Sequence, residues 1–142
     1  MRRFASKDSK RDFYILYTLV FGVIAGFIYY QFAGNGKSLV WSHDGIPQHL
    51  NSLAYYGRYL REVLHTIFVE HKLELPMWDM NIGYGSDILT TLHYYVIGDP
   101  LTLLSVFVPA DKTEVLYEVL IFLRIYLAGI SFSVFCFYFK FL

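Results

Sequence analysis

Two long runs of apolar residues lie near the two ends of the chain. The first, Phe13 to Phe32, contains about twenty uncharged residues, which at roughly 1.5 Å per residue match a hydrocarbon core of about 30 Å. The second, Val115 to Phe139, is long enough to span a bilayer as well. Both runs are therefore predicted to be transmembrane helices. The segment between them, residues 33–114, is far longer than a simple connection, and loops of that size tend to be functional.

Charge gives the predicted spans an orientation. Basic residues cluster before the first run, at Arg2, Arg3, Lys7, Lys10 and Arg11. Because Lys and Arg favour the cytoplasmic side, residues 1–12 are predicted to be cytoplasmic and residues 33–114 extracytoplasmic, with Lys140 marking the return to the cytoplasm. The composition, 56% hydrophobic and 20% aromatic over 142 residues, exceeds the needs of a small soluble core. The formal charge is zero, and the local basic cluster indicates no nucleic-acid partner.

The segment between the runs begins with a helical pattern. Apolar residues recur in steps of three and four, with Gly57 completing the row: Ile46, Leu50, Leu53, Leu60, Leu64 and Ile67. Mostly polar residues lie opposite: Gln48, Asn51, Arg58, Arg61, Glu62 and His65. This pattern predicts an amphipathic helix over about residues 46–70 that lies along the outer membrane interface. The alternative is a helix packed on a soluble extracytoplasmic domain.

Glycine and proline divide the rest of the segment into short pieces. Ser86 or Asp87 is predicted to cap a helix that runs to about Val96. Residues 101–108 are apolar but too short to span alone, so they are predicted to form an interfacial or re-entrant piece. The whole chain is thus predicted to be an all-α membrane protein, with two transmembrane helices joined by a long extracytoplasmic segment of interfacial and short helices.

The stretch "WSHDGIPQHL", Trp41 to Leu50, carries the densest candidate chemistry. Asp44 suits two roles: an N-cap with Pro47 in the first turn, or a general base or ligand for a hard cation such as Mg²⁺ or Mn²⁺. Gln48 follows four residues later and shares its face if the helix has begun. His43 and His49 lie six positions apart, which is not the spacing of a helical metal pair, so their roles as ligands, phosphate contacts or incidental surface residues stay open.

Arg124 is the other residue that needs an account. It lies about nine residues into the second run, roughly 13 Å at helical rise and near the middle of a bilayer. Its helical neighbours three and four positions away include no acid. The counter-charge must therefore come from another segment, as a structural ion pair, or from a bound anion such as a phosphate.

Two stretches carry a resemblance to a known family: "GKSLVWSHDGIPQHLNSLAYYGRYLRE" and "LPMWDMNIGYGSDILTTLHYYVIGDPLTLLSVFVP". From about Gly36 onward the chain resembles the N-terminal part of the YfhO family of bacterial multi-pass membrane proteins, whose members are much longer. The resemblance implies a partial fold like that of the C-type membrane glycosyltransferases, which use a polyprenyl-phosphate sugar as donor on the outer face. It also implies glycosylation of cell-wall polymers such as lipoteichoic acid.

The same resemblance assigns roles to particular residues. An acidic residue in the first outer loop is the catalytic feature of such enzymes, and Asp44 matches it, with His43, Gln48, His49 and Asp87 lining the site. The chemistry of such a transfer also needs charge stabilisation on the departing phosphate, which a divalent cation, or Arg124 together with basic residues from other segments, would supply. The implied partners are the lipid bilayer, the lipid-linked sugar, the polymer acceptor and the remaining transmembrane helices of the longer protein. The fragment alone is expected to be inactive, and a transporter component or a truncated assembly protein is the alternative.

Overall fold

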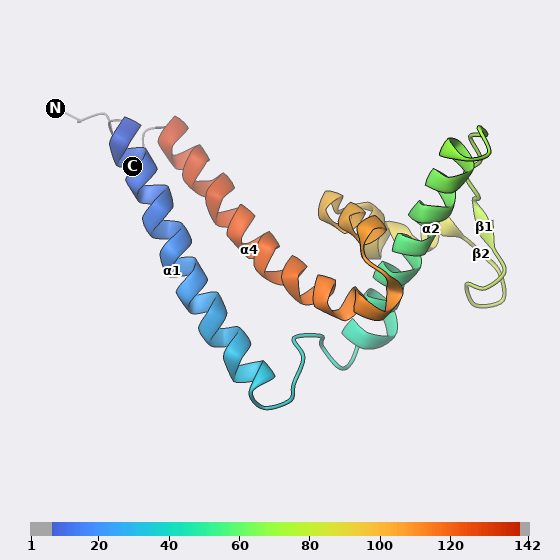
Figure 1. Cartoon of the computed structure of the whole chain (residues 1–142), viewed down its shortest axis with the longest axis horizontal. Coiled ribbons are helices and arrows are strands. Elements are labelled where there is room, and N and C mark those ends of the chain that lie inside the picture. Colours follow the sequence, from blue (N-terminus) through green and yellow to red (C-terminus); the bar gives the residue numbers. More distant parts are fainter. Residues whose placement is uncertain (1–6, 140–142) are drawn as a thin grey trace. The chain divides into compact units, whose positions relative to one another are not determined.

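The structure, a computed structural model, describes residues 7–139. The basic residues Arg2 and Arg3 and the predicted exit residue Lys140 lie outside the described residues. The described chain is mostly helical (Figure 1) and divides into two compact units. One unit contains the chain up to Leu39 and from Ile121 onward, and the other contains Val40–Leu120.

The first unit is built from helix α1 (Lys7–Ala33) and most of helix α4 (Thr113–Tyr138). Tyr17 joins the two helices, because its hydroxyl donates to the Tyr126 carbonyl at 3.0 Å and the two rings stack. Gly129 makes this approach possible, since a Cβ there would clash with the Tyr17 ring. Phe13 meets Phe137 edge to face, so the helices run antiparallel.

Two helical stretches of the described chain are long and apolar enough to cross a membrane, Ser9–Ala33 and Ala110–Tyr138. They overlap the two predicted spans. Most large apolar side chains of α1 are exposed, as expected of a helix that meets lipid or further helices. The orientation of the termini stays a prediction.

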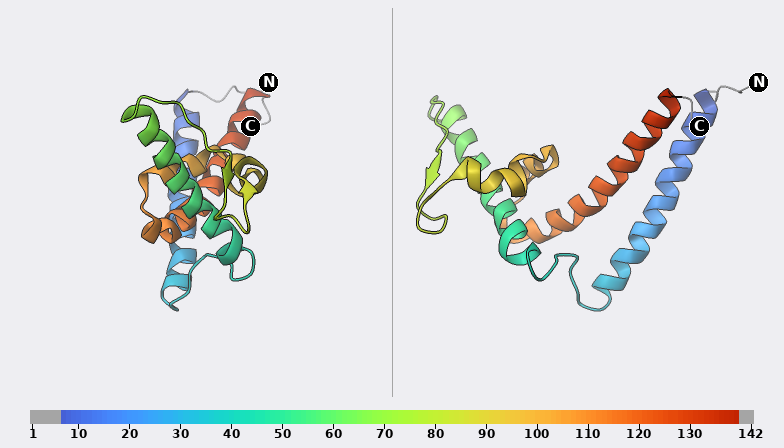
Figure 2. Two further views of the ribbon diagram at one scale, coloured as in Figure 1. Left: turned by 90° about the vertical axis from the view of Figure 1, so that its right-hand side faces the viewer. Right: turned by 180° about the vertical axis from the view of Figure 1, so that it is seen from behind.

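The second unit begins with a π-helical turn, η1 (Gly45–Leu50), which runs directly into helix α2 (Asn51–Phe68). The strands β1 (Trp78–Asp79) and β2 (Ser86–Asp87) form a hairpin, followed by α3 (Ile88–Leu92) and a second π-helical turn, η2 (His93–Ile97). The 3₁₀ segments η3 (Pro100–Phe107) and η4 (Ala110–Lys112) lead into α4. Figure 2 shows these elements from two further sides.

The hairpin corrects the all-α prediction in one detail. β1 and β2 are antiparallel, with Trp78 opposite Asp87 and Asp79 opposite Ser86. Gly83 and Gly85 have φ values of 62° and 104°, which glycine adopts without the strain of a side chain. The sequence pattern indicated a tight turn at these glycines, but two paired residues per strand are too few to produce an alternating pattern.

The buried face of α2 differs from the predicted apolar stripe. Leu53, Tyr56 and Val63 are buried, whereas Ile46 is 49% exposed and Leu64 is 40% exposed. Part of the reason is η1, because a π-helical turn adds a residue per turn and displaces Ile46 from the row. The face that α2 does bury packs mainly against η3, with Gly57 at the closest approach.

Arg61 was expected on the polar face of this helix, and that placement is wrong. Its side chain is half-buried, and Nη1 donates to the carbonyl oxygens of Ser105, Val106 and Val108 at 3.0, 3.3 and 2.9 Å. These carbonyls lie at the end of η3, where a positive charge is favourable, and the Ser105 carbonyl also accepts from the Val108 amide at 3.2 Å. Arg61 therefore fixes residues 101–108 to α2. Their predicted position at or in the membrane stays a prediction.

Candidate functional site

Asp44 lies in the exposed turn that leads into η1. Its backbone is helical, with φ −80° and ψ −19°, and its side chain makes no capping hydrogen bond. An N-cap usually has extended dihedrals that direct the side chain back to the first turn. The predicted capping role of Asp44 is therefore wrong. Its main-chain carbonyl instead accepts from the amides of Gln48 and His49.

The Asp44 carboxylate belongs to a short hydrogen-bonded chain. Gln48 Nε2 donates to Asp44 Oδ1 at 3.1 Å, and the Tyr95 hydroxyl donates to Gln48 Oε1 at 2.8 Å. Tyr95 comes from η2, so the chain joins two elements that are far apart in sequence. The amide of Gln48 is thereby oriented, with its nitrogen toward the carboxylate. The sequence placed Asp44 and Gln48 together but gave no indication of Tyr95.

His49 lies beside the same group through its ring. Its imidazole meets the ring of Tyr95 edge to face at 5.2 Å and lies 6.2 Å from the ring of Tyr94, which is 75% exposed. Aromatic contacts of this kind restrict the orientation of the ring. We name the set Asp44, Gln48, His49, Tyr94 and Tyr95 the carboxylate cluster.

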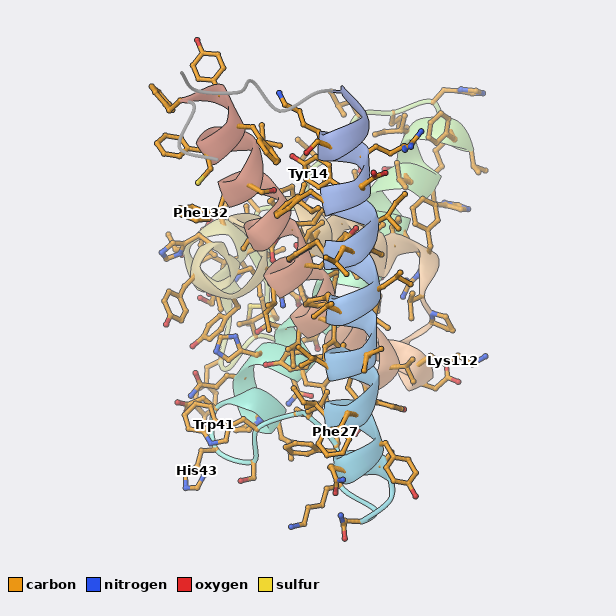
Figure 3. All side chains as sticks on the ribbon, turned by 90° about the vertical axis from the view of Figure 1, so that its left-hand side faces the viewer. Tyr14, Phe27, Trp41, His43, Lys112 and Phe132 are labelled. Carbon is orange, nitrogen blue, oxygen red and sulfur yellow. The ribbon has the colours of Figure 1, made fainter. Side chains whose placement is uncertain are left out.

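His43 and Asp87 are not part of the carboxylate cluster. The exposed imidazole of His43 stacks on Trp41 at 5.8 Å, and Figure 3 shows both side chains on the loop before η1. Asp87 caps α3, where its Oδ1 accepts from the amide of Thr90 at 2.7 Å, so the predicted cap is confirmed for Asp87. That amide, followed by the Thr90 hydroxyl, lowers the pKa of the Asp87 carboxyl. Bonding to Thr90 thus accounts for the Asp87 side chain without a substrate.

Arg124 lies in α4, within the unit that contains α1, and its side chain is half-buried. The carboxylate cluster belongs to the other unit. The geometry of the cluster therefore involves residues 44–95 only, and the role of Arg124 stays a prediction.

A comparison with family sequence models identifies the chain. The family described as "Bacterial membrane protein YfhO" matches residues 16–141. The chain belongs to the YfhO family. A search of curated proteins found no match, and neither did a search of solved structures.

The metal predicted at Asp44 can be tested against the donor groups of this YfhO-family chain. Mg²⁺ and Mn²⁺ need several oxygen ligands. Among the residues that the structure describes, no three His, Cys, Asp or Glu side chains are grouped to hold an ion. Asp44 Oδ1 also already accepts from Gln48. A divalent cation at Asp44 therefore stays a prediction.

A second polar cluster of the YfhO-family chain lies between α2 and the hairpin, and sequence reasoning missed it. The Tyr55 hydroxyl donates to Asp79 Oδ2 at 2.5 Å. This hydrogen bond is the main cause that lowers the pKa of Asp79, whereas burial is the main cause that raises the pKa of Tyr55. A cleft of about 560 Å³ opens beside this pair. The Asp79–Asn81 spacing, typical of a local turn, was the one available signal.

Proposed function

We propose that this YfhO-family protein forms the N-terminal part of a membrane glycosyltransferase. It would transfer a sugar from a polyprenyl-phosphate donor to a cell-envelope polymer, such as a teichoic acid, on the outer face of the bacterial cytoplasmic membrane. Support comes from the membrane-protein family, from the two candidate spans and from an exposed carboxylate in the segment between them. The donor's lipid tail would stay in the bilayer while its sugar reaches residues 33–114.

The observation that carries the proposal is the state of the Asp44 carboxylate. It is exposed and caps no helix, and within the described residues its side chain is bonded to Gln48 alone. A general base needs an oxygen within reach of the hydroxyl that it deprotonates. Gln48 binds Oδ1, so Oδ2 is the oxygen available to an acceptor hydroxyl.

In the proposed reaction, Asp44 acts as the general base for attack of the acceptor hydroxyl on the donor sugar. Asp44 Oδ2 takes the proton of the acceptor hydroxyl as its oxygen forms a bond to the anomeric carbon. The bond between that carbon and the phosphate oxygen breaks, and polyprenyl phosphate leaves. Gln48, oriented by Tyr95, holds the carboxylate for this step. Such a base contributes typically about 10²–10⁴-fold in rate.

The departing phosphate needs positive charge or hydrogen-bond donors. Within the carboxylate cluster, His49 is the cationic candidate when protonated. His43 and Arg124 are candidates from outside the cluster. Further basic groups would come from the remaining transmembrane helices of the longer family members.

The test is complementation of a strain that lacks its YfhO-family protein, with the complete gene product that contains this chain. Variants are compared at matched membrane levels, and glycosylation of the cell-wall polymer is measured. Asp44→Asn is expected to lower the transfer rate by about 10²-fold or more. Asp111→Asn, an exposed acid outside the carboxylate cluster, is the control and is expected to retain activity.

Wild-type transfer by Asp44→Asn would show that the carboxylate is dispensable and that the base assignment is wrong. If Arg124→Gln then abolishes polymer modification while Asp44→Asn supports it, the transporter alternative is favoured. Gln48→Ala gives an intermediate test, because it leaves the base in place and removes its hydrogen bond. A smaller rate loss than that of Asp44→Asn is expected.

A further inference from the structure

The cleft between α2 and the hairpin has no role in the transfer step described above. It has a volume of about 560 Å³ and is lined from one side by α2 and from the other by the hairpin and the residues next to it. The views in Figures 1 and 2 show the hairpin beside α2. Apart from Pro76 and Ile88, the lining side chains are aromatic, charged or amide-bearing. The lining residues are Tyr55, Arg58, Tyr59, Glu62, Pro76, Trp78, Asp79, Asn81 and Ile88.

The frame of the cleft is held by hydrogen bonds. Asp79 accepts from the Tyr55 hydroxyl through Oδ2, and from the amide and side chain of Asn81 through Oδ1 at 2.7 and 2.9 Å. The Tyr59 hydroxyl donates to the Pro76 carbonyl at 3.2 Å. The Asp79 carboxylate is therefore occupied in holding the hairpin to α2. A ligand would meet other groups.

Trp78 supplies an exposed aromatic surface at the rim of this frame. Its indole N–H donates to Met80 Sδ at 3.3 Å, and a Cβ on Gly85 would lie 3.2 Å from the indole. The side chain is nevertheless 61% exposed. The indole is therefore held at its N–H while most of the side chain remains exposed. An aromatic face is negative, so it attracts the weakly positive C–H groups on the flat face of a pyranose.

Two charged side chains of α2, Arg58 and Glu62, line the cleft together with Trp78. Arg58 stands over the ring of Tyr55 at 5.3 Å, and Glu62 follows one turn later on α2. Both are exposed, and within the described part of the chain neither forms an ion pair. A guanidinium and a carboxylate together offer donors and acceptors to vicinal hydroxyls. With Asp79 the formal charge at the cleft is −1, which disfavours a phosphate.

We propose that the cleft binds a neutral hexopyranose unit, with the Trp78 indole as its stacking surface and with Arg58 and Glu62 hydrogen-bonded to its hydroxyls. The sugar is either that of the lipid-linked donor or a unit of a glycan. This site goes beyond the chemistry at Asp44. It is detected by binding rather than by transfer, so either proposal can fail alone.

The experiment uses the complete gene product in lipid nanodiscs and measures binding of methyl hexopyranosides by saturation-transfer NMR. Glycerol, which has hydroxyls but no pyranose face, is the negative ligand. Trp78→Ala is expected to raise the Kd about tenfold, the factor that corresponds to about 1.4 kcal/mol. Glu62→Gln, which leaves the aromatic surface intact, is expected to raise it by a similar factor. Trp41→Ala removes a tryptophan that is 58% exposed outside the cleft and is expected to bind like wild type.

Absence of glycoside binding to the wild-type protein overturns the proposal. So does a Kd equal to the wild-type value in both Trp78→Ala and Glu62→Gln, or a tenfold rise of the Kd in Trp41→Ala. Displacement by inorganic phosphate overturns the neutral specificity. Competition by the lipid-linked sugar or by the isolated glycan supports the site and identifies the source. Asp44→Asn is expected to bind the glycoside like wild type, which separates this result from a failure of the transfer proposal.

Discussion

Gly57 is the position where a single methyl group should separate two elements of the outer segment. A Cβ built on Gly57 would lie 2.6 Å from the Ser105 carbonyl oxygen and 3.1 Å from its carbonyl carbon. Carbon atoms in ordinary contact are about 3.5–4.0 Å apart. The obstacle is backbone rather than a flexible side chain. In Gly57→Ala, η3 must therefore move away from α2 by several tenths of an ångström or more.

The magnitude of the change follows from two costs and one gain. Forcing an extra methyl into a packed contact costs typically about 1–3 kcal/mol. Ala in place of Gly within a helix returns about 0.8–1.0 kcal/mol. The shift also lengthens the bond from Arg61 Nη1 to the Ser105 carbonyl, now 3.0 Å, at a loss of up to about 1 kcal/mol. We therefore expect Gly57→Ala to weaken the packing of η3 on α2 by about 1–2 kcal/mol in free energy.

Hydrogen exchange of the η3 amides in membrane-embedded protein measures this change. An opening made easier by about 1–2 kcal/mol speeds exchange roughly 5–30-fold. Gly22→Ala is the matched control, because a Cβ on that helical glycine meets nothing within 4 Å, and it should leave η3 unchanged. Wild-type exchange of η3 in Gly57→Ala would refute the close approach and with it the role given to this glycine.

Two further outcomes are expected from the contacts of the outer unit. Arg61→Met keeps the side chain's length but removes the charged donor from the carbonyls at the end of η3, so η3 should be destabilised by about 2–3 kcal/mol. A thermal or exchange profile equal to wild type would contradict this. The hydrogen bond from Tyr55 lowers the pKa of the Asp79 carboxyl in the folded protein. The ionised carboxylate therefore stabilises the fold fully above the pKa of unfolded Asp, about 3.9, and this stabilisation is lost as the pH falls through the lower pKa of the folded state. Intrinsic-rate-corrected exchange of β1 and β2 should therefore rise only below about pH 4, and Asp79→Asn should remove that step.

A helix-capping test separates the structural and functional accounts of Asp87. Asn caps a helix about as well as Asp, whereas Ala does not. Asp87→Ala should speed exchange of the α3 amides severalfold, and Asp87→Asn should leave exchange and transfer near wild type. Loss of transfer in Asp87→Asn with α3 intact would assign the carboxylate to the reaction and overturn its purely structural role.

Much of the helical architecture was predictable because it depends on local pattern. The two apolar runs and the Asp87 cap are read from residues that are close in sequence. What the pattern missed are contacts made at long range. Arg61 has the periodicity of a solvated residue, and only η3, more than forty residues away, gives it partners. The π-helical turn before α2 has no reliable sequence signal, and it displaced the predicted stripe.

The candidate site divides in the same way. Asp44 and Gln48 are four residues apart, so their hydrogen bond follows from helical geometry once the turn has formed. Tyr95 joins them from η2, across a separation that no periodicity encodes. Asp44 was also expected to be an N-cap from residue type alone, and its helical dihedrals decide against that.

The carboxylate cluster and the cleft are mechanically connected through one continuous segment. β2 is followed without a break by α3 and then by η2, so the strand paired with Asp79 leads directly to Tyr95. At the other side, η1 runs directly into α2, so Gln48 and Tyr55 lie seven residues apart on one continuous helical segment. A tyrosine hydroxyl donates a hydrogen bond at each site, from Tyr55 to Asp79 in the cleft and from Tyr95 to Gln48 in the carboxylate cluster. Because β2 continues through α3 into η2, we expect undocking of the hairpin to loosen the hydrogen bond from Tyr95 to Gln48 as well.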